Sequence, residues 1–238
     1  RSHTHGCLPD MIELDKYLQL HTAPVVATDI VIDPDEFESL MQQHQYAFRS
    51  WGEKKKHFPR YGLPLVNQNG SMYNNPEPVC YPLDEWLEPL AEQDWVFDRD
   101  FTQKTPVFEH SVFDPLKRFD DYWCRSCILR WDSEAFFYPH SDTWFPSPIL
   151  RLWGTTDPDN VKFQFDREFR RAPTPGTVSS MEPDMVDWQG DIEPGRMYIV
   201  DTSLIHTARS QGTHPTYQFF LAVHSDAFDQ MQRSVCSL

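Results

Sequence analysis

The stretch FFYPHSDTWF, residues 136–145, carries the most information about the fold. It places a histidine, His140, and a carboxylate, Asp142, two positions apart inside a run of aromatic residues. Successive side chains of a β-strand alternate between its faces, so these two residues would point the same way on a strand. A polar turn between two strands would look similar, and the rest of the chain has to separate the two interpretations.

A His-x-Asp pair alone is weak evidence, because roughly one such match is expected by chance in a chain of this composition. The sequence contains a second pair, His224 and Asp226. Only the first pair is followed by another histidine on a later strand-like segment, His206 in GRMYIVDTSLIHTARS. No histidine follows His224, and we interpret it as a residue at the end of a strand.

His140, Asp142 and His206 together fit a metal site. Two imidazoles and one carboxylate bind one side of an octahedral metal and leave three positions open. Fe(II) uses such positions for a bidentate cosubstrate and O2. The alternative for His206 is a polar residue in the loop after the strand at residues 197–200. The three residues in this order favour the metal.

Short β-rich runs begin near Cys124. They contain β-branched and aromatic residues separated by Pro, Gly, Asp or Ser, which is typical of strands. With 20 Pro and only 9 Gly, the chain is expected to be rich in rigid connections. We therefore predict a β-barrel or β-sandwich with helices packed on it. The predicted strands cover residues 127–131, 135–142, 149–156, 161–166, 196–202 and 216–224.

The part before these strands is expected to be helical and irregular. Asp33 followed by Pro34 predicts a helix start, and the apolar spacing predicts that this helix reaches Trp51. Residues 82–92 are a second, shorter helix candidate, and the Pro- and Asn-rich stretch 58–73 is predicted to be a loop. We expect one domain, 1–238, with an N-terminal helical and loop part, 1–120, and a β core, 121–228.

Composition excludes several partners. The net charge of -15 argues against nucleic acid, whose phosphates bind clustered Lys and Arg. No apolar run approaches the roughly 20 residues of a membrane span, so no membrane partner is expected. The first ten residues lack a signal peptide's apolar core. Cys124 and Cys127 have no second CxxC to complete a zinc site, and we expect reduced packing residues in a cytoplasmic protein.

The segments LRWDSEAFFYPHSDTW, ILRLWGTT, PGRMYIVDTSLIHTARS and TYQFFLAV resemble the Fe(II)/2-oxoglutarate-dependent oxygenases, over about residues 124–224. The resemblance looks closest to the prolyl- and aspartyl/asparaginyl-hydroxylase-like branches. It implies a double-stranded β-helix of the jelly-roll or cupin type, with Fe(II), 2-oxoglutarate and O2 as cofactors. It also implies decarboxylation of 2-oxoglutarate to succinate, coupled to hydroxylation of an unactivated C–H bond. Halogenating relatives have a small residue at the position of Asp142, which favours hydroxylation or desaturation here.

The chain departs from the family at one point. Relatives often carry Arg or Lys on the strand after the distal His, where it binds the far carboxylate of 2-oxoglutarate. Here that strand offers Gln218 and no cation. A dicarboxylate in an apolar barrel needs a cationic partner, and we rank Arg151 first, Arg209 second and Arg130 third. The alternative for Arg151 is a strand residue whose charged end reaches solvent.

The substrate is least constrained. Arg60 and Tyr61 in the predicted loop, and Trp144 and Trp153 near the metal residues, are candidate substrate contacts, although loop packing and a plain aromatic core explain them equally. The acidic insert 172–191 is a candidate lid that would favour a cationic group such as an amine. We expect a small molecule, such as a free amino acid, or a peptide side chain.

Two other functions remain open. One is a non-catalytic or sensory metal-binding protein of cupin type that keeps the three metal residues. The other is a cupin enzyme independent of 2-oxoglutarate, which would more typically show extra His ligands and Gly-rich motifs. A buried Arg or Lys facing the metal, at the reach of a five-carbon diacid, distinguishes an oxygenase from both.

Overall fold

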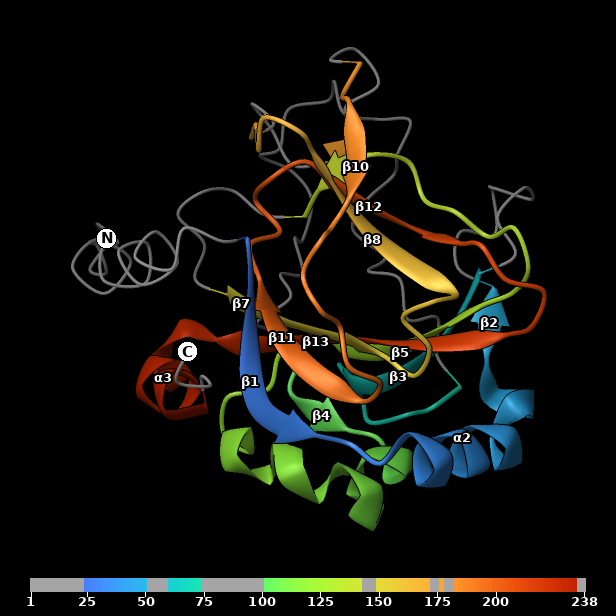
Figure 1. Ribbon diagram of the computed structural model, residues 1–238. Helices are drawn as coiled ribbons and strands as arrows, with labels where there is room; N and C mark the ends of the chain where they lie inside the picture. The colour runs from blue at the N-terminus through green and yellow to red at the C-terminus, as the bar shows by residue number, and fades with distance from the viewer. Residues whose placement is uncertain are drawn as a thin grey trace, which may run out of the picture.

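The structure, a computed structural model, describes residues 24–50, 60–73, 101–142, 149–171, 176–177 and 182–234. Its strands form two antiparallel sheets (Figure 1). The larger sheet has the order β1-β11-β7-β13-β5-β3-β2, with β4 also paired to β3. Its strands are β1 (Val25–Val31), β2 (Arg49–Ser50), β3 (Arg60–Asn67), β4 (Gln103–Lys104), β5 (Ser126–Trp131), β7 (Ile149–Thr155), β11 (Arg196–Val200) and β13 (Thr216–His224).

The smaller sheet has the order β10-β8-β12-β6-β9. Its strands are β6 (His140–Ser141), β8 (Val161–Asp166), β9 (Gly176–Thr177), β10 (Met185–Asp187) and β12 (His206–Ser210). From β5 onward the chain passes repeatedly between the sheets, with β5, β7, β11 and β13 in the larger and β6, β8, β10 and β12 in the smaller. The predicted mainly β fold is confirmed.

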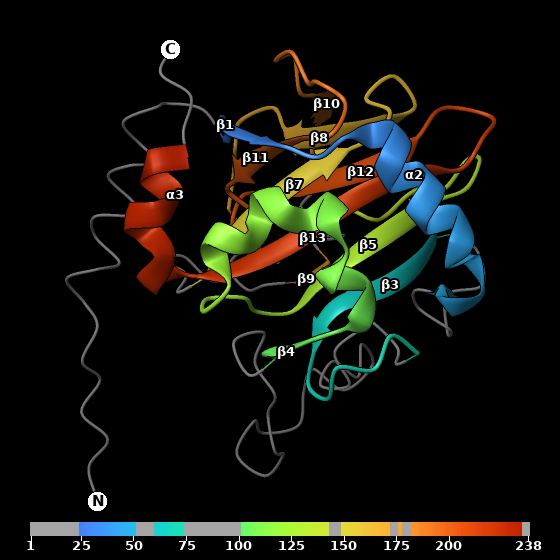
Figure 2. The same cartoon turned by 90° about the horizontal axis from the view of Figure 1, so that it is seen from below.

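Two apolar cores result from the alternation of side chains in the larger sheet. One face packs against the N-terminal helices (Figure 2), so Phe219 and Leu221 of β13 join the cluster that contains Phe37 of the helix α2 (Pro34–Gln43). The other face meets the smaller sheet, where the rings of Trp153 and Phe163 lie 4.9 Å apart. The candidate site opens within this second core.

The first helix, α2 (Pro34–Gln43), begins where the sequence predicts. The Asp33 side chain caps it by accepting hydrogen bonds from the backbone N–H groups of Asp35 and Glu36, both at 3.0 Å. The helix ends at Gln43, earlier than predicted, because the chain must turn into β2 and pair with β3. The predicted helix at 82–92 lies outside the described residues.

The other helical segments among the described residues are short. They are η1 (Gln45–Ala47), η3 (Pro106–Glu109), η4 (Ser111–Phe119), η6 (Ser225–Ala227) and α3 (Phe228–Ser234). Within the described part of the chain, no helix has both the length and the apolar character needed to cross a bilayer.

The predicted loop at 58–73 is wrong for its central part, because residues 60–67 form the eight-residue strand β3 between β5 and β2. Gly62 and Pro64 obscured this strand, since both are unfavourable in strand interiors. Pro64, which has no N–H to donate, lies at an irregularity in the register with β5. This strand brings Arg60 to the larger sheet.

Candidate metal site and adjoining cavity

His140, Asp142 and His206 lie together, although 66 positions separate the two histidines in the sequence. One ligand atom from each residue lies within 4.8 Å of the others. Asp142 Oδ1 is 3.2 Å from His140 Nε2, and Asp142 Oδ2 is 3.7 Å from His206 Nε2. Three potential ligand atoms therefore converge on one point.

The backbone fixes the orientation of both imidazoles. His140 Nδ1 lies 2.9 Å from the carbonyl oxygen of Tyr138, and His206 Nδ1 lies 2.9 Å from that of Leu204. A carbonyl oxygen only accepts, so each Nδ1 carries the proton and donates. In the neutral imidazole, Nε2 then carries the lone pair on the side of Asp142, which is the tautomer that a metal requires.

The charges also suit a cation. Burial lowers the pKa of His206 to about 4, helped by the neighbouring charge of His140, so His206 is neutral near pH 7. Burial alone would raise the pKa of Asp142, whereas the hydrogen bond and charge of His140 lower it. The charges of His206 and Arg151 add to this effect, and the pKa of Asp142 falls well below its usual value.

Asp142 shows the clearest fit to a metal. Its backbone N–H donates a hydrogen bond to the Thr202 carbonyl oxygen at 2.9 Å, which holds the residue in place. Its Oδ2 atom is buried and accepts no hydrogen bond from the described residues. A buried acceptor without a partner is costly, and a divalent cation bound by all three side chains would remove that cost.

A cavity adjoins the three residues and encloses about 450 Å³, counting the part open to solvent. The histidines lie on its smaller-sheet side, and the larger sheet supplies the polar residues of the opposite side. Among the described residues that line it, two are cations and none is a carboxylate. The lining residues are Arg60, Leu129, Trp131, Phe137, His140, Arg151, Leu152, Trp153, Phe163, Thr202, His206, Ala208, Gln218 and Phe220.

Two of the four expected cofactor contacts reach this cavity. Arg151 on β7 is 3% exposed, and its guanidinium carbon lies 4.7 Å from the ring centre of Phe220. Gln218 on β13 is equally buried, and its Oε1 accepts a hydrogen bond from Trp131 Nε1 at 2.8 Å. Both come from the larger sheet and point toward the smaller one.

The other two expected cofactor contacts, Arg130 and Arg209, lie outside the cavity. Arg130 points to the helix-covered face, where it pairs with Asp132 at 3.0 Å and lies 4.3 Å from the ring centre of Tyr61. Arg209 is on the exposed face of β12, 3.5 Å from Asp187. Strand alternation explains both positions, since each is adjacent to a residue that lines the cavity.

The expected substrate contacts are also divided. Arg60 and Trp153 line the cavity, whereas Tyr61 packs beside Arg130 on the other face. Trp144 lies outside the described residues. The buried Nε1 of Trp153 has no hydrogen-bond partner among the described groups and is a donor that a bound molecule can use.

Sequence reasoning missed the aromatic residues that hold the histidines. The ring of Phe137 meets His140 edge-on with centres 4.3 Å apart, and Phe163 stacks on His206 with centres 5.4 Å apart. The aromatic run at 136–145 was the available signal for Phe137. These contacts keep the imidazole faces away from water.

The second His-x-Asp pair lies at the end of β13, as predicted. His224 Nδ1 is 3.2 Å from Asp226 Oδ2, and Asp226 is exposed. In the described ranges, only His140, Asp142 and His206 form a group of three potential ligands. Cys124 and Cys127 are buried, which agrees with packing roles.

The acidic insert is described only in part. Asp184 pairs with Arg167 at 2.5 Å, and Asp187 lies near Arg209. These carboxylates therefore have cationic neighbours within the protein. A lid that attracts a cationic substrate remains a prediction.

No protein-family model and no curated protein matches this chain. Among solved structures, HygX from Streptomyces hygroscopicus with nickel, 2-oxoglutarate and hygromycin B bound is 13% identical, with a TM-score of 0.47 over 88% of this chain and 86% of that one. A 2OG-Fe(II) oxygenase family oxidoreductase from Burkholderia pseudomallei is 11% identical, with a TM-score of 0.45 over 94% and 92%.

The epimerase SnoN in complex with Fe3+, alpha ketoglutarate and nogalamycin RO is 9% identical, with a TM-score of 0.49 over 90% of this chain and 83% of that one. Similarity at this level does not assign an activity. The activity of this chain is therefore inferred from its own residues.

Proposed function

We propose that this protein is an Fe(II)/2-oxoglutarate-dependent dioxygenase that hydroxylates an unactivated C–H bond. The observation that carries the proposal is the convergence of His140, Asp142 and His206 on one point beside a cavity that two arginines line. Two imidazoles and one carboxylate are the ligand set of non-haem Fe(II) oxygenases. We assign the chain to the hydroxylase-like branches of this family, in a double-stranded β-helix core.

The overall reaction is balanced without a further reductant. A substrate C–H group, 2-oxoglutarate and O2 give the corresponding alcohol, succinate and CO2. One oxygen atom of O2 enters the alcohol and the other enters succinate. O2 is the oxidant, with two electrons from 2-oxoglutarate and two from the C–H bond, and a bound Fe(II) would activate it. The protein's residues bind, orient and shield the reacting groups.

Particular residues would perform these tasks. The Nε2 atoms of His140 and His206 and the carboxylate of Asp142 would hold the metal, with both imidazoles already oriented by backbone carbonyl groups. Arg151 and Gln218 are the proposed contacts of 2-oxoglutarate on the larger-sheet side. Trp153 would contact the substrate, and its N–H group would donate to a polar atom of that molecule.

The substrate proposed is a small molecule such as a free amino acid, or a peptide side chain, in a cytoplasmic setting. The cavity is lined mostly by apolar and aromatic side chains with a few polar groups among them, which is typical of small-molecule sites. The aromatic residues around the histidines would exclude water from the reacting groups.

Succinate formation tests the proposal. Purified protein would be supplied with Fe(II), ascorbate, 2-oxoglutarate and air, and succinate would be quantified with and without a pool of candidate substrates. We expect slow substrate-independent formation of succinate that stops in Asp142→Ala and increases with the right substrate. Full Fe(II) occupancy with no succinate under any condition would contradict the proposal and favour a sensory metal-binding protein.

A further inference from the structure

Arg60 is held in a defined position in the cavity. It lies on β3 as the register partner of Trp131 on β5, and it is 5% exposed. Its guanidinium carbon is 5.3 Å from the ring centre of Trp131 and 4.0 Å from that of Phe137. Stacking on aromatic faces fixes the plane of the guanidinium, and a guanidinium binds carboxylates in that plane through paired N–H donors.

Gln218 completes the same corner of the cavity. Trp131 on β5 donates to Gln218 Oε1, which fixes the orientation of the amide and leaves its Nε2 as the donating end. Trp131 therefore touches both residues, stacking with Arg60 on one neighbouring strand and bonding to Gln218 on the other. Three adjacent strands, β3, β5 and β13, bring a cation and a neutral donor together.

This corner lies one aromatic ring away from the metal residues. Phe137 separates Arg60 from His140, with 4.0 Å from guanidinium to ring and 4.3 Å from ring to ring. A diacid that chelates a metal through its 2-oxo acid end carries its second carboxylate three carbons further on. A partner for that second carboxylate must lie near the metal but not against it, and Arg60 meets this condition.

Arg151 lies at the opposite end of the cavity from Arg60. Trp131, the partner of Arg60, pairs with Thr216, and Arg151 pairs with Ala222, so the two arginines lie six positions apart along β13. That separation corresponds to about 20 Å between the backbone positions of the two arginines, measured along the strand direction. Arg151 pairs with Val200 on β11, two residues before Thr202, whose carbonyl oxygen accepts a hydrogen bond from the Asp142 N–H. Arg151 therefore lies at the metal end of the cavity.

We propose that Arg60, together with Gln218, binds the distal carboxylate of the 2-oxo diacid cosubstrate, and that Arg151 lies at its metal-chelating end. The inference rests on the proposed function and deepens it. It makes Arg60 the residue that selects a diacid over a 2-oxo monoacid. The cation that is absent from β13 at Gln218 is supplied by β3, two strands away in the same sheet.

Paired titrations test this assignment. Anaerobic Fe(II) protein would be titrated with 2-oxoglutarate and with 2-oxopentanoate, which has the same chain length but no distal carboxylate. The visible charge-transfer band would report each dissociation constant. We expect wild-type protein to prefer the diacid roughly 100-fold, the effect of one buried charge-assisted pair. Arg60→Gln should abolish the preference by weakening 2-oxoglutarate binding alone.

Further variants make the test specific. Arg60→Lys should restore part of the preference, and Gln218→Leu should reduce it by roughly fivefold. Arg151→Gln should weaken both acids alike, because both share the chelating end. Arg130→Gln is the matched control, since Arg130 also stacks on an aromatic ring but lies on the other face of the sheet, and it should bind both acids as wild type does.

The outcomes are distinguishable. If Arg60→Gln keeps the full preference, or if Arg151→Gln alone abolishes it, the assignment of Arg60 is overturned while the proposed function stands. If wild-type protein binds Fe(II) and forms no band with either acid, the proposed function fails as well. Should Arg60→Gln not fold, as judged by circular dichroism, Arg60→Lys and Gln218→Leu still decide the matter.

Discussion

His140 and His206 are direct partners in the ladder between β6 and β12, and their ring centres lie 4.4 Å apart. The two proposed metal ligands are therefore placed by backbone pairing of adjacent strands. β12 is in turn paired with β8 over five positions, which makes His206 part of a continuous sheet. A site built on paired strands is more rigid than one built on loops.

Loss of any one of the three residues should therefore remove metal binding. We expect Fe(II) affinity to fall by more than about 100-fold in His140→Ala, because two ligands and no replacement would remain. His224→Ala is the control, since His224 belongs to the second His-x-Asp pair and should bind Fe(II) as wild type does. Equilibrium dialysis with metal analysis measures both, and equal affinity in His140→Ala and wild type would refute the assignment.

Acid stability should depend on Asp166. This buried carboxylate accepts hydrogen bonds from Arg170 Nε and Nη2 at 2.8 and 2.7 Å, and these bonds lower its pKa despite burial. Because the folded-state pKa is lowered, the stabilisation is present above the unfolded value of about 3.9 and is lost as the pH falls below it.

Asp166→Asn should cost about 2 kcal/mol near pH 7, the value of hydrogen bonds to a charged group. The difference in unfolding free energy between wild type and variant should shrink as the pH is lowered from about 5 toward 3. Urea denaturation of the metal-free proteins at several pH values measures it. A difference that stays constant across this range would show that the ion pair does not contribute.

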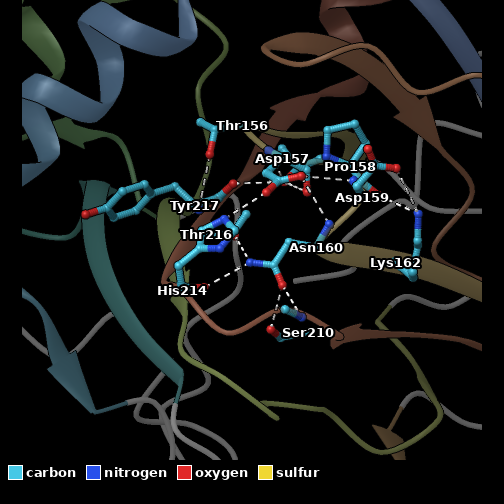
Figure 3. A network of polar contacts seen from close by, with 12 residues as sticks. Thr156, Asp157, Pro158, Asp159, Asn160, Lys162, Ser210, His214, Thr216 and Tyr217 are labelled. Atoms are coloured by element: carbon cyan, nitrogen blue, oxygen red, sulfur yellow. Dashed lines mark hydrogen bonds and ion pairs between the residues drawn. The ribbon is translucent and has the colours of Figure 1, made fainter.

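Asn160 should be important for stability away from the metal. Its buried side chain joins the turn after β7 to the loop between β12 and β13 (Figure 3). Nδ2 donates to the His214 carbonyl oxygen at 2.9 Å and to Thr216 Oγ1, while Oδ1 accepts from Ser210 Oγ at 3.1 Å and from the Gly212 N–H.

Asn160→Ala removes all four contacts and leaves their partners unsatisfied, so it should cost about 3 kcal/mol. Asp159→Ala changes the neighbouring exposed residue and should cost less than about 0.5 kcal/mol. Chemical denaturation compares the two variants. Equal unfolding free energies of the two variants would mean that water satisfies the hydrogen-bonding groups that Asn160 contacts.

The sequence was informative where a local pattern determined the structure. Residues close together in the chain define the His-x-Asp pair and the strand runs at 149–156 and 161–166. The order of these features along the chain then indicated His206. Asp33 and Pro34 set the helix start through local hydrogen bonding and a fixed backbone angle. His206 itself begins β12, so it lies on a strand and not in the loop that was its alternative.

The position of Arg60 could not be derived in this way. It depends on the order β3-β5-β13, which joins residues 60, 131 and 218 across long sequence distances. Gly62 and Pro64 also disguised its strand as a loop. Arg130 and Arg209 were ranked by their place in the sequence and not by the strand face that each occupies. A shift of one residue along a strand moves a side chain to the other face of the sheet.

The most direct test of the account is the binding of Fe(II) together with 2-oxoglutarate in the absence of O2. Wild-type protein should develop the weak visible charge-transfer band of a chelated ferrous 2-oxo acid, and His206→Ala should not. A wild-type protein that binds Fe(II) tightly and shows no band on addition of 2-oxoglutarate would contradict the central claim that this cavity holds both.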